Sequence, residues 1–456
     1  MRTTPNRRDD AGLARRCFKQ AAETARTSSR EDLLAHFQRV RAASVEMCRP
    51  LTAETYRIQP AEEVSPPWWN LGHTSWHYVR AALEPFGGRR EPEDDEFDFV
   101  LNSYYAVFGE RLARGRRGSL SKPTTEEIYA YRASVDRRVE ELLMQISEER
   151  LDELAFRLVV GMNHEQQHQE LFYTEIKNIL AQNPPSLRAA YLPSDASEST
   201  GGLPDPLRFL EFSGGLSEFG HAGPEWCWDN ELPRHKHFLA PFALADRLTT
   251  NGEFLAFIED GGYQRQLLWL DNGWNAACEQ AWKAPLYWER VDGEWHNWTL
   301  AGLRPLAMDE PACHLSFYEA DAFTRWRSET FADEGSVRLP TEREWEHAAR
   351  RMECQADAGA FLDLGRLHPR PATGTAPLRQ MFGVAWQWTA SYYEPYPGYQ
   401  SFAGDLAEYN GKFMDNQRVL RGGSCATPQD HFRVTYRNFW PAVTRFQFTG
   451  LRLARN

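Results

Sequence analysis

The segment 155–181 constrains the fold of this chain more than any other stretch of the sequence. Its apolar residues recur at helical spacing, so the segment is predicted to be a helix with one face in a protein interior. His164 and His168 lie one turn apart and project from the same face, which Leu158, Phe172 and Ile176 mark as interior. Two imidazoles aimed into an interior are either hydrogen-bonded core residues or part of a metal site.

The same residues spell H-E-x-x-H, a motif in which two histidines bind zinc and the glutamate is the general base of a protease. This function would give the role of general base to Glu165 and would need a third ligand. The longer form of the motif, with a glycine and a third histidine, is absent, and 183–186 (NPPS) carries no ligand. A zinc hydrolase is therefore kept as an alternative.

The composition argues against several classes of function. A formal net charge of -12 disfavours nucleic acid as the main partner, and no apolar run is long enough to cross a bilayer. The first residues lack the apolar core of a signal peptide. The seven cysteines form no C-x-x-C pair, which indicates reduced thiols and a cytoplasmic protein.

Four helices are expected in the first 183 residues, after a polar lead-in at 1–27. The first helix begins at a capping box made by Ser29 and Asp32. Four long helices with short or moderate connections predict an antiparallel bundle, which can place metal ligands on facing helices. The acidic run 91–96 is interpreted as solvated and without function. The predicted helices cover about 29–48, 68–83, the residues after a capping box in 123–127, and 149–181.

The character of the sequence changes after residue 183. The segment 184–206 is rich in Pro, Ser, Gly and Asp and is predicted to be a linker between a bundle, 28–183, and a second domain, 207–456. Short apolar runs alternate with turns in the second domain, and the chain is therefore expected to be an α+β multidomain protein. Its few helices each begin at a capping pair: Thr250 with Glu253, Ser316 with Glu319, and Thr341 with Glu344.

Two sets of motifs resemble known families. In the second half, 338–346 (RLPTEREWE), 382–389 (FGVAWQWT), 420–424 (LRGGS) and 450–453 (GLRL) resemble the formylglycine-generating-enzyme domain, which has a C-type-lectin-like fold. In the first half, the histidine motif with Glu170 resembles the DinB-like bundle fused to that domain in the ergothioneine sulfoxide synthases. The motifs 102–105 (NSYY), 117–124 (RGSLSKPT) and 409–414 (YNGKFM) also match that family.

The resemblance implies a non-haem iron enzyme. Members of the family use Fe(II) and O2 to join a thiol sulfur to the imidazole C2 of hercynine, N-α-trimethylhistidine, and to form a sulfoxide. By match to its motifs the iron ligands are His73, His164 and His168, a set of neutral imidazoles that suits Fe(II). Glu170 is expected beside the ligands rather than among them. His77 lies one turn from His73, and a structural or pocket-lining role is expected for it.

The resemblance also implies the residues that bind the substrates. Tyr393 matches a catalytic tyrosine that could donate a proton near the iron, although an aromatic turn packing two loops is the alternative. Gln167 matches a residue that orients the imidazole. The positions matched for the quaternary ammonium group of hercynine, which needs aromatic faces or carbonyl oxygens, are Tyr396, Asn438 and Phe439.

The sulfur donor is less well defined. Arg114 and Arg117 match arginines that hold its carboxylates, but a solvated basic loop is the other interpretation of 111–117. Some members bind γ-glutamylcysteine with an acidic residue where this chain has Trp440. That difference is compatible with free cysteine or with the selenosugar used by selenoneine synthases. The oligomeric state and a structural Ca2+ in the second domain are left open.

Two further alternatives remain. A formylglycine-generating oxidase would need a pair of cysteines near the C-terminus, where Cys425 stands alone. A binding module that has lost its chemistry would hold no metal.

Overall fold

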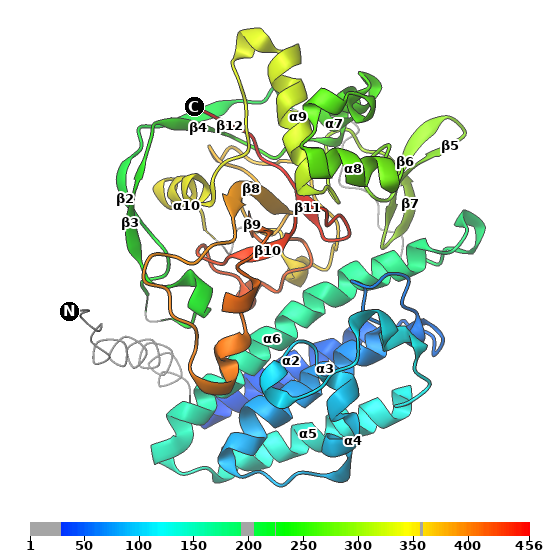
Figure 1. Ribbon diagram of the computed structural model, residues 1–456, viewed down its shortest axis with the longest axis vertical. Coiled ribbons are helices and arrows are strands. Elements are labelled where there is room, and N and C mark those ends of the chain that lie inside the picture. The colour runs from blue at the N-terminus through cyan, green and yellow to red at the C-terminus, as the bar shows by residue number, and fades with distance from the viewer. Residues whose placement is uncertain (1–28, 193–204, 224, 356–358) are drawn as a thin grey trace, which may run out of the picture. The chain divides into compact units, whose positions relative to one another are not determined.

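The computed structural model describes residues 29–192, 205–223, 225–355 and 359–456, so the expected lead-in at 1–27 and most of the expected linker lie outside them. The chain forms two compact units, and neither is continuous in sequence (Figure 1). The first unit contains the described residues up to Ile179 and two later segments, His221–Pro233 and Gly398–Lys412, called here the crossing segments. The second unit contains the rest. None of the described helices is both long enough and apolar enough to span a membrane.

The first unit is a helical bundle. Its helices are α2 (Arg30–Cys48), α3 (Pro67–Tyr78), α4 (Pro92–Leu101), α5 (Thr125–Gln145) and α6 (Glu148–Ala181). The four predicted helices are all present, and Ser29 with Asp32 and Thr124 with Glu127 form the capping boxes that begin α2 and α5. Leu33, Val135 and Leu158, on three different helices, are buried in the core. The predicted bundle is therefore confirmed.

One interpretation of the bundle sequence was wrong. The run 91–96 is not simply solvated, because α4 begins within it and Asp94 is buried. The Asp94 carboxylate accepts hydrogen bonds from both terminal nitrogens of Arg138, at 2.7 and 3.0 Å, and from the backbone of Glu91. A buried carboxylate needs such partners, and Arg138 is too far away in the sequence for the acidic run to reveal the pair.

The described part of the second unit contains short strands, four α-helices and one mixed sheet of four strands. That sheet has the order β10 (Asn438–Pro441), β9 (Gln417–Arg421), β8 (Trp386–Tyr392), β11 (Thr449–Gly450). Its pairs are antiparallel except β8 with β11, which is parallel. A three-stranded sheet joins β1 (Phe209–Phe212), β4 (Phe242–Ala245) and β12 (Ala454–Arg455). Two smaller antiparallel sheets pair β2 (Gly215–Phe219) with β3 (His235–Leu239), and β5 (Trp288–Val291) with β6 (Glu294–Thr299) and β7 (Gly302–Pro305).

The helices of this unit are α7 (Asn251–Glu259), α8 (Asp271–Glu279), α9 (Phe317–Thr330) and α10 (Glu342–Arg351). Each of the three predicted capping pairs forms a capping box, at the start of α7, α9 and α10. The α+β multidomain class is confirmed.

The sequence motifs of the second unit meet in its core. Trp345 of α10 and the buried Arg452 both donate hydrogen bonds to Oε1 of Gln387 on β8, at 2.9 and 2.8 Å. Arg452 has no carboxylate partner at this point, and burial lowers its pKa to about 9. These residues of the sequence motifs therefore support the fold.

Candidate metal centre

Three histidine side chains from two helices of the first unit converge. His73 of α3 and His164 and His168 of α6 each offer a ring nitrogen, and these atoms lie within 4.8 Å of one another. The ring centroids are 4.6–5.0 Å apart. Among the described residues this is the only group of three or more His, Cys, Asp or Glu side chains with such spacing, so a Ca2+ site in the second unit gains no support.

The ring nitrogens of these histidines differ in whether they have a hydrogen-bond partner. His73 Nδ1 donates to the carbonyl oxygen of Leu101 at 2.6 Å, and its buried Nε2 has no hydrogen-bond partner. His168 Nδ1 lies 2.8 Å from Asn70 Oδ1. Neither ring nitrogen of the buried His164 has a partner. Buried polar atoms without partners are costly, and a metal ion would satisfy them.

All three imidazoles are neutral, as metal ligation requires. Burial lowers the pKa of His73 and His164 well below the ordinary value, and the neighbouring histidines lower it further. For His168, burial followed by the positive charge of Arg117 lowers the pKa to about 3. The donor set therefore fits a divalent transition metal that accepts imidazole nitrogen.

His77 lies beside this cluster but outside it. Its ring centroid is 4.1 Å from that of His164, the side chain is buried, and neither of its nitrogens has a partner. Burial lowers its pKa to about 4. Glu170 is also buried on α6 and does not belong to the group of converging ligand atoms.

Glu165 is bound by three side chains of the bundle core. Its carboxylate accepts hydrogen bonds from Arg132 at 2.6 Å, Ser44 at 2.6 Å and Arg41 at 3.0 Å. Burial alone would raise its pKa, but the two arginines outweigh burial and lower the pKa to about 2. A carboxylate clamped in this way cannot serve as the general base of a zinc hydrolase, so the structure argues against that alternative.

Gln167 is held by a residue from a crossing segment. The hydroxyl group of Tyr409 donates to Gln167 Oε1 at 2.6 Å. The Tyr409 ring lies 5.9 Å from the ring of His164 and stacks at 4.2 Å on Trp228 of the other crossing segment. Sequence reasoning used Tyr409 only as part of a motif and missed Trp228, because nothing in the local sequence links either residue to α6.

The two crossing segments are tied together by a buried carboxylate that the sequence did not reveal. Asp229 accepts hydrogen bonds from Asn410 Nδ2 at 2.7 Å, from the Tyr399 hydroxyl group at 3.0 Å and from the Phe402 amide at 3.2 Å. Burial raises the pKa of Asp229 despite these bonds. Asp405, in the crossing segment Gly398–Lys412, forms an ion pair with Arg157 of α6 at 2.9 Å.

Arg114 and Arg117, the two arginines predicted to bind carboxylates of the sulfur donor, have different environments. Arg114 is exposed and donates to the backbone oxygen of Glu63. Arg117 is buried, donates to Ser65 Oγ at 2.8 Å and lies 3.3 Å above the ring of Trp69. Its Nε has no partner, and burial lowers its pKa to about 9. Trp69 in turn stacks on His73 at 4.5 Å.

The remaining site residues gather within the second unit. Tyr393, just after β8, stacks at 4.0 Å on Phe439 of β10. The guanidinium group of Arg437, which sequence reasoning missed, lies 5.1 Å from the ring centroid of Tyr393 and 4.0 Å from that of Tyr396. It is paired with Glu342 at 2.9 Å.

Two other predicted residues lie on the same strand, β10. Asn438 Oδ1 accepts from the amide of Phe439 at 2.8 Å. Trp440 packs against Phe446, with ring centroids 5.4 Å apart.

Comparison with known proteins matches the two halves of the sequence to two families. Residues 207–361 and 370–456, more than half of the chain, match the sulfatase-modifying factor enzyme 1-like domain. The chain belongs to this family. Residues 36–172 match the DinB superfamily. The DinB match contains all three histidines, and the sulfatase-modifying factor domain contains Tyr393, Tyr396 and the β10 residues.

Three curated relatives are hercynine oxygenases. The protein of Mycolicibacterium thermoresistibile is 35% identical over 257 residues, 51% of this chain and 55% of that protein. The chain therefore spans little more than half the length of this relative. The protein of Mycolicibacterium smegmatis is 29% identical over 86% of this chain and 91% of its own length. The protein of Mycobacterium tuberculosis is 28% identical over 94% and 99%, so the similarity extends over both domains.

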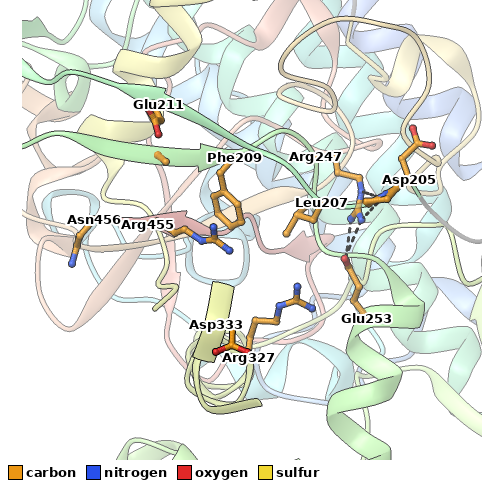
Figure 2. Close-up of a pocket in the computed structure, with 12 residues that line it drawn as sticks. Asp205, Leu207, Phe209, Glu211, Arg247, Glu253, Arg327, Asp333, Arg455 and Asn456 are labelled. Atoms are coloured by element: carbon orange, nitrogen blue, oxygen red, sulfur yellow. Dashed lines mark hydrogen bonds and ion pairs between the residues drawn. The ribbon is translucent and has the colours of Figure 1, made fainter. Parts of the chain in front are cut away.

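Two features of the sulfatase-modifying factor domain lie outside these site residues. Cys425 is buried and forms no disulfide. A cavity of about 760 Å³ is lined by Asp205, Arg247, Glu253 and Arg327, among others, and by none of the predicted site residues (Figure 2). Arg247 donates to the backbone oxygen of Asp205 and to the Glu253 carboxylate, as the dashed lines of Figure 2 show. The cavity carries charges of both signs and suggests no ligand.

Proposed function

We propose that this protein is an Fe(II)- and O2-dependent enzyme that joins a sulfur atom to the imidazole C2 of hercynine and oxidises the product to a sulfoxide. The observation that carries the proposal is the cluster of His73, His164 and His168, in which buried ring nitrogens of His73 and His164 have no hydrogen-bond partner. The similarity to hercynine oxygenases over both domains supports the choice of substrate. Bound by these three residues, Fe(II) would supply the activation of O2.

The proposal assigns roles to several side chains by their match to the ergothioneine sulfoxide synthases. Gln167 binds the imidazole of hercynine, and the Tyr409 hydroxyl group fixes the orientation of its amide. Tyr393 donates a proton to the reacting oxygen, and the stacked ring of Phe439 holds its phenol in place. The aromatic faces of Tyr396 and Phe439, together with Asn438, surround the quaternary ammonium group.

The sulfur donor carries a carboxylate in this proposal. Arg117 is buried and its Nε lacks a partner, so a planar carboxylate from the donor would complete its hydrogen bonds. Trp440 stands where some family members have an acidic residue, which favours a donor without the α-amino group of γ-glutamylcysteine at that place. Free cysteine is the candidate donor that fits Arg117, and a selenosugar, which would supply selenium and has no carboxylate for this arginine, is the alternative donor.

The test compares three donors in parallel reactions. The Fe(II) protein is incubated with hercynine without oxygen, and O2 is then added with cysteine, γ-glutamylcysteine or a selenosugar. Mass spectrometry should detect a hercynine conjugate with one donor and none with His164→Ala protein. Absence of any conjugate, with iron bound, would contradict the proposal.

Tyr393→Phe tests the proton donor separately. This variant should keep its iron and turn over, but a larger share of the thiol should be oxidised without forming the carbon–sulfur bond. Product ratios from the two proteins, measured on the same donor, give the answer. An unchanged ratio would remove Tyr393 from the reaction.

A further inference from the structure

A buried line of hydrogen bonds connects His168 to a carboxylate seven residues further along α6. His168 Nδ1 lies 2.8 Å from Asn70 Oδ1, and Asn70 Nδ2 donates to Glu175 Oε2 at 2.6 Å. Glu175 Oε1 accepts from the backbone amide of Ser65 at 2.8 Å. Asn70 and Glu175 are both buried, with 5% and 1% of their surface exposed. None of the functions assigned above uses Asn70 or Glu175.

The chemistry of these groups sets the direction of every bond in the line. When Glu175 is ionised its carboxylate only accepts hydrogen bonds, and the Asn70 amide then turns its NH2 group toward Glu175, which is the direction of the bond in the structure. Its oxygen must then face His168, which can only donate to it from Nδ1. In a neutral imidazole that donates from Nδ1, the lone pair lies on Nε2. The carboxylate therefore determines which nitrogen of His168 is available to a metal.

Glu175 is acted on by two positive charges but hydrogen-bonds to neither of them. The charged groups that act on it from neighbouring elements are Arg114 and Arg117, and Arg117 reaches the same loop through Ser65 Oγ. No ion pair to Glu175 is found among the described residues. Burial, only partly offset by Ser65, Asn70 and these arginines, raises its pKa to about 7. A carboxylate kept in so dry a position, at a cost in stability, indicates a role other than packing.

We propose that Glu175 is a positioning residue of the metal centre, which acts through Asn70 to hold His168 with Nε2 directed at the metal. His73 has a comparable arrangement with the Leu101 carbonyl oxygen, which is fixed by the backbone. His168 instead depends on an amide that could rotate, and Glu175 prevents the rotation. Partners of this kind raise the affinity of a histidine ligand for its metal. The proposal concerns metal binding and does not depend on which donor the enzyme uses.

The experiment measures metal affinity rather than turnover. Wild type, Glu175→Gln, Asn70→Ala and the double variant are titrated with Co(II) against a competing chelator, and the d–d absorption bands report the ligand geometry. A glutamine at 175 must turn an NH2 group toward either Ser65 or Asn70, so one of the two donors loses its acceptor. Both single variants should bind Co(II) about 10–100-fold more weakly, and the double variant should be no weaker than the weaker single variant.

The matched control is Asp94→Asn, which neutralises another buried carboxylate of the same bundle, paired with Arg138 and not with a histidine. It should lower thermal stability and leave Co(II) affinity unchanged. Affinities of Glu175→Gln and Asn70→Ala within twofold of wild type would overturn the proposal, and so would additive losses in the double variant. A wild-type enzyme that binds metal and forms no hercynine conjugate would contradict the proposed function while leaving this inference intact.

Discussion

Two buried carboxylates on α6, ten residues apart, have opposite electrostatic environments. Glu165 is clamped by Arg41, Arg132 and Ser44, and its pKa falls to about 2. Glu175 is met by the uncharged donors of Ser65 and Asn70, and its pKa rises to about 7. Burial raises the pKa of both groups, and only at Glu165, where Arg41 and Arg132 bond directly to the carboxylate, is that effect outweighed.

The difference in partners indicates different roles for the two carboxylates. Glu165 joins α6 to α2 and α5, and its charge is permanent at any physiological pH. Glu175 is linked to His168 through the Asn70 amide, and because its pKa is about 7, its ionised and protonated forms are similarly populated near neutral pH. Glu165, the glutamate within H-E-x-x-H, therefore holds helices together, whereas Glu175, which belongs to no motif, is linked through Asn70 to His168.

The largest effect is expected from Glu165→Gln. This change leaves two buried guanidinium groups without their carboxylate, which should lower the free energy of unfolding by about 3–5 kcal/mol. Urea denaturation measures the loss, with the exposed Glu153→Gln as the control. Metal affinity of the folded fraction should stay unchanged. A loss below about 1 kcal/mol would show that the clamp around Glu165 is not structural.

The next effect is a dependence of stability on pH. Because the pKa of Glu175 is raised in the folded protein, to about 7 from an ordinary 4.5, the folded state holds a proton that the unfolded state has lost. Its favourable contribution is complete below about pH 4.5 and is lost as the pH rises through 7, a change of about 3 kcal/mol. Glu165 has the opposite sign, since its contribution is present above pH 4.5 and is lost as the pH falls toward 2.

Metal-free wild type and Glu175→Gln, unfolded in urea at pH 5 and at pH 8, test this sign. The stability of wild type relative to the variant should fall between the two pH values. A relative stability that rises instead would show that Glu175 is stabilised as an anion, like Glu165, and the contrast between the two groups would disappear.

The smallest effect concerns Gln167, which lies between these two glutamates on α6. Tyr409→Phe removes one hydrogen bond and keeps the ring that stacks on Trp228, so hercynine binding should weaken by about 0.5–1.5 kcal/mol, or about 2–10-fold. Calorimetry without O2 measures the dissociation constant. Tyr399→Phe is the control, because Tyr399 lies in the same crossing segment as Tyr409 and its hydroxyl group donates to Asp229 of the other segment, not to Gln167. Equal effects of the two variants would remove the role of Tyr409.

The parts of the structure that could be predicted are those with local signals. Capping boxes and helical periodicity predicted α2, α3, α5 and α6, because these patterns lie within a few residues of one another. The pairing of His164 with His168 is equally local. The choice of His73 rested on the resemblance, since His77 has the same spacing, and the structure brings His73 into the group and leaves His77 beside it.

The remaining features depend on contacts between residues far apart in the sequence. Asn70 reaches Glu175, and Tyr409 reaches Gln167, across more than a hundred positions in each case. Asp94 was misread because its partner, Arg138, lies on another helix. Polar residues of this kind have no periodicity, and only the folded chain shows that their side chains meet.

The crossing segments, His221–Pro233 and Gly398–Lys412, belong by sequence to the sulfatase-modifying factor domain and by packing to the bundle. The boundary of the matched family domain and the boundary of the compact unit are therefore different in this chain. A bundle expressed alone, cut before residue 207, would lack Tyr409, which donates to Gln167 of α6, and Trp228, which stacks on Tyr409. Domain exchange among relatives should accordingly succeed only when both segments travel with the helices they cover.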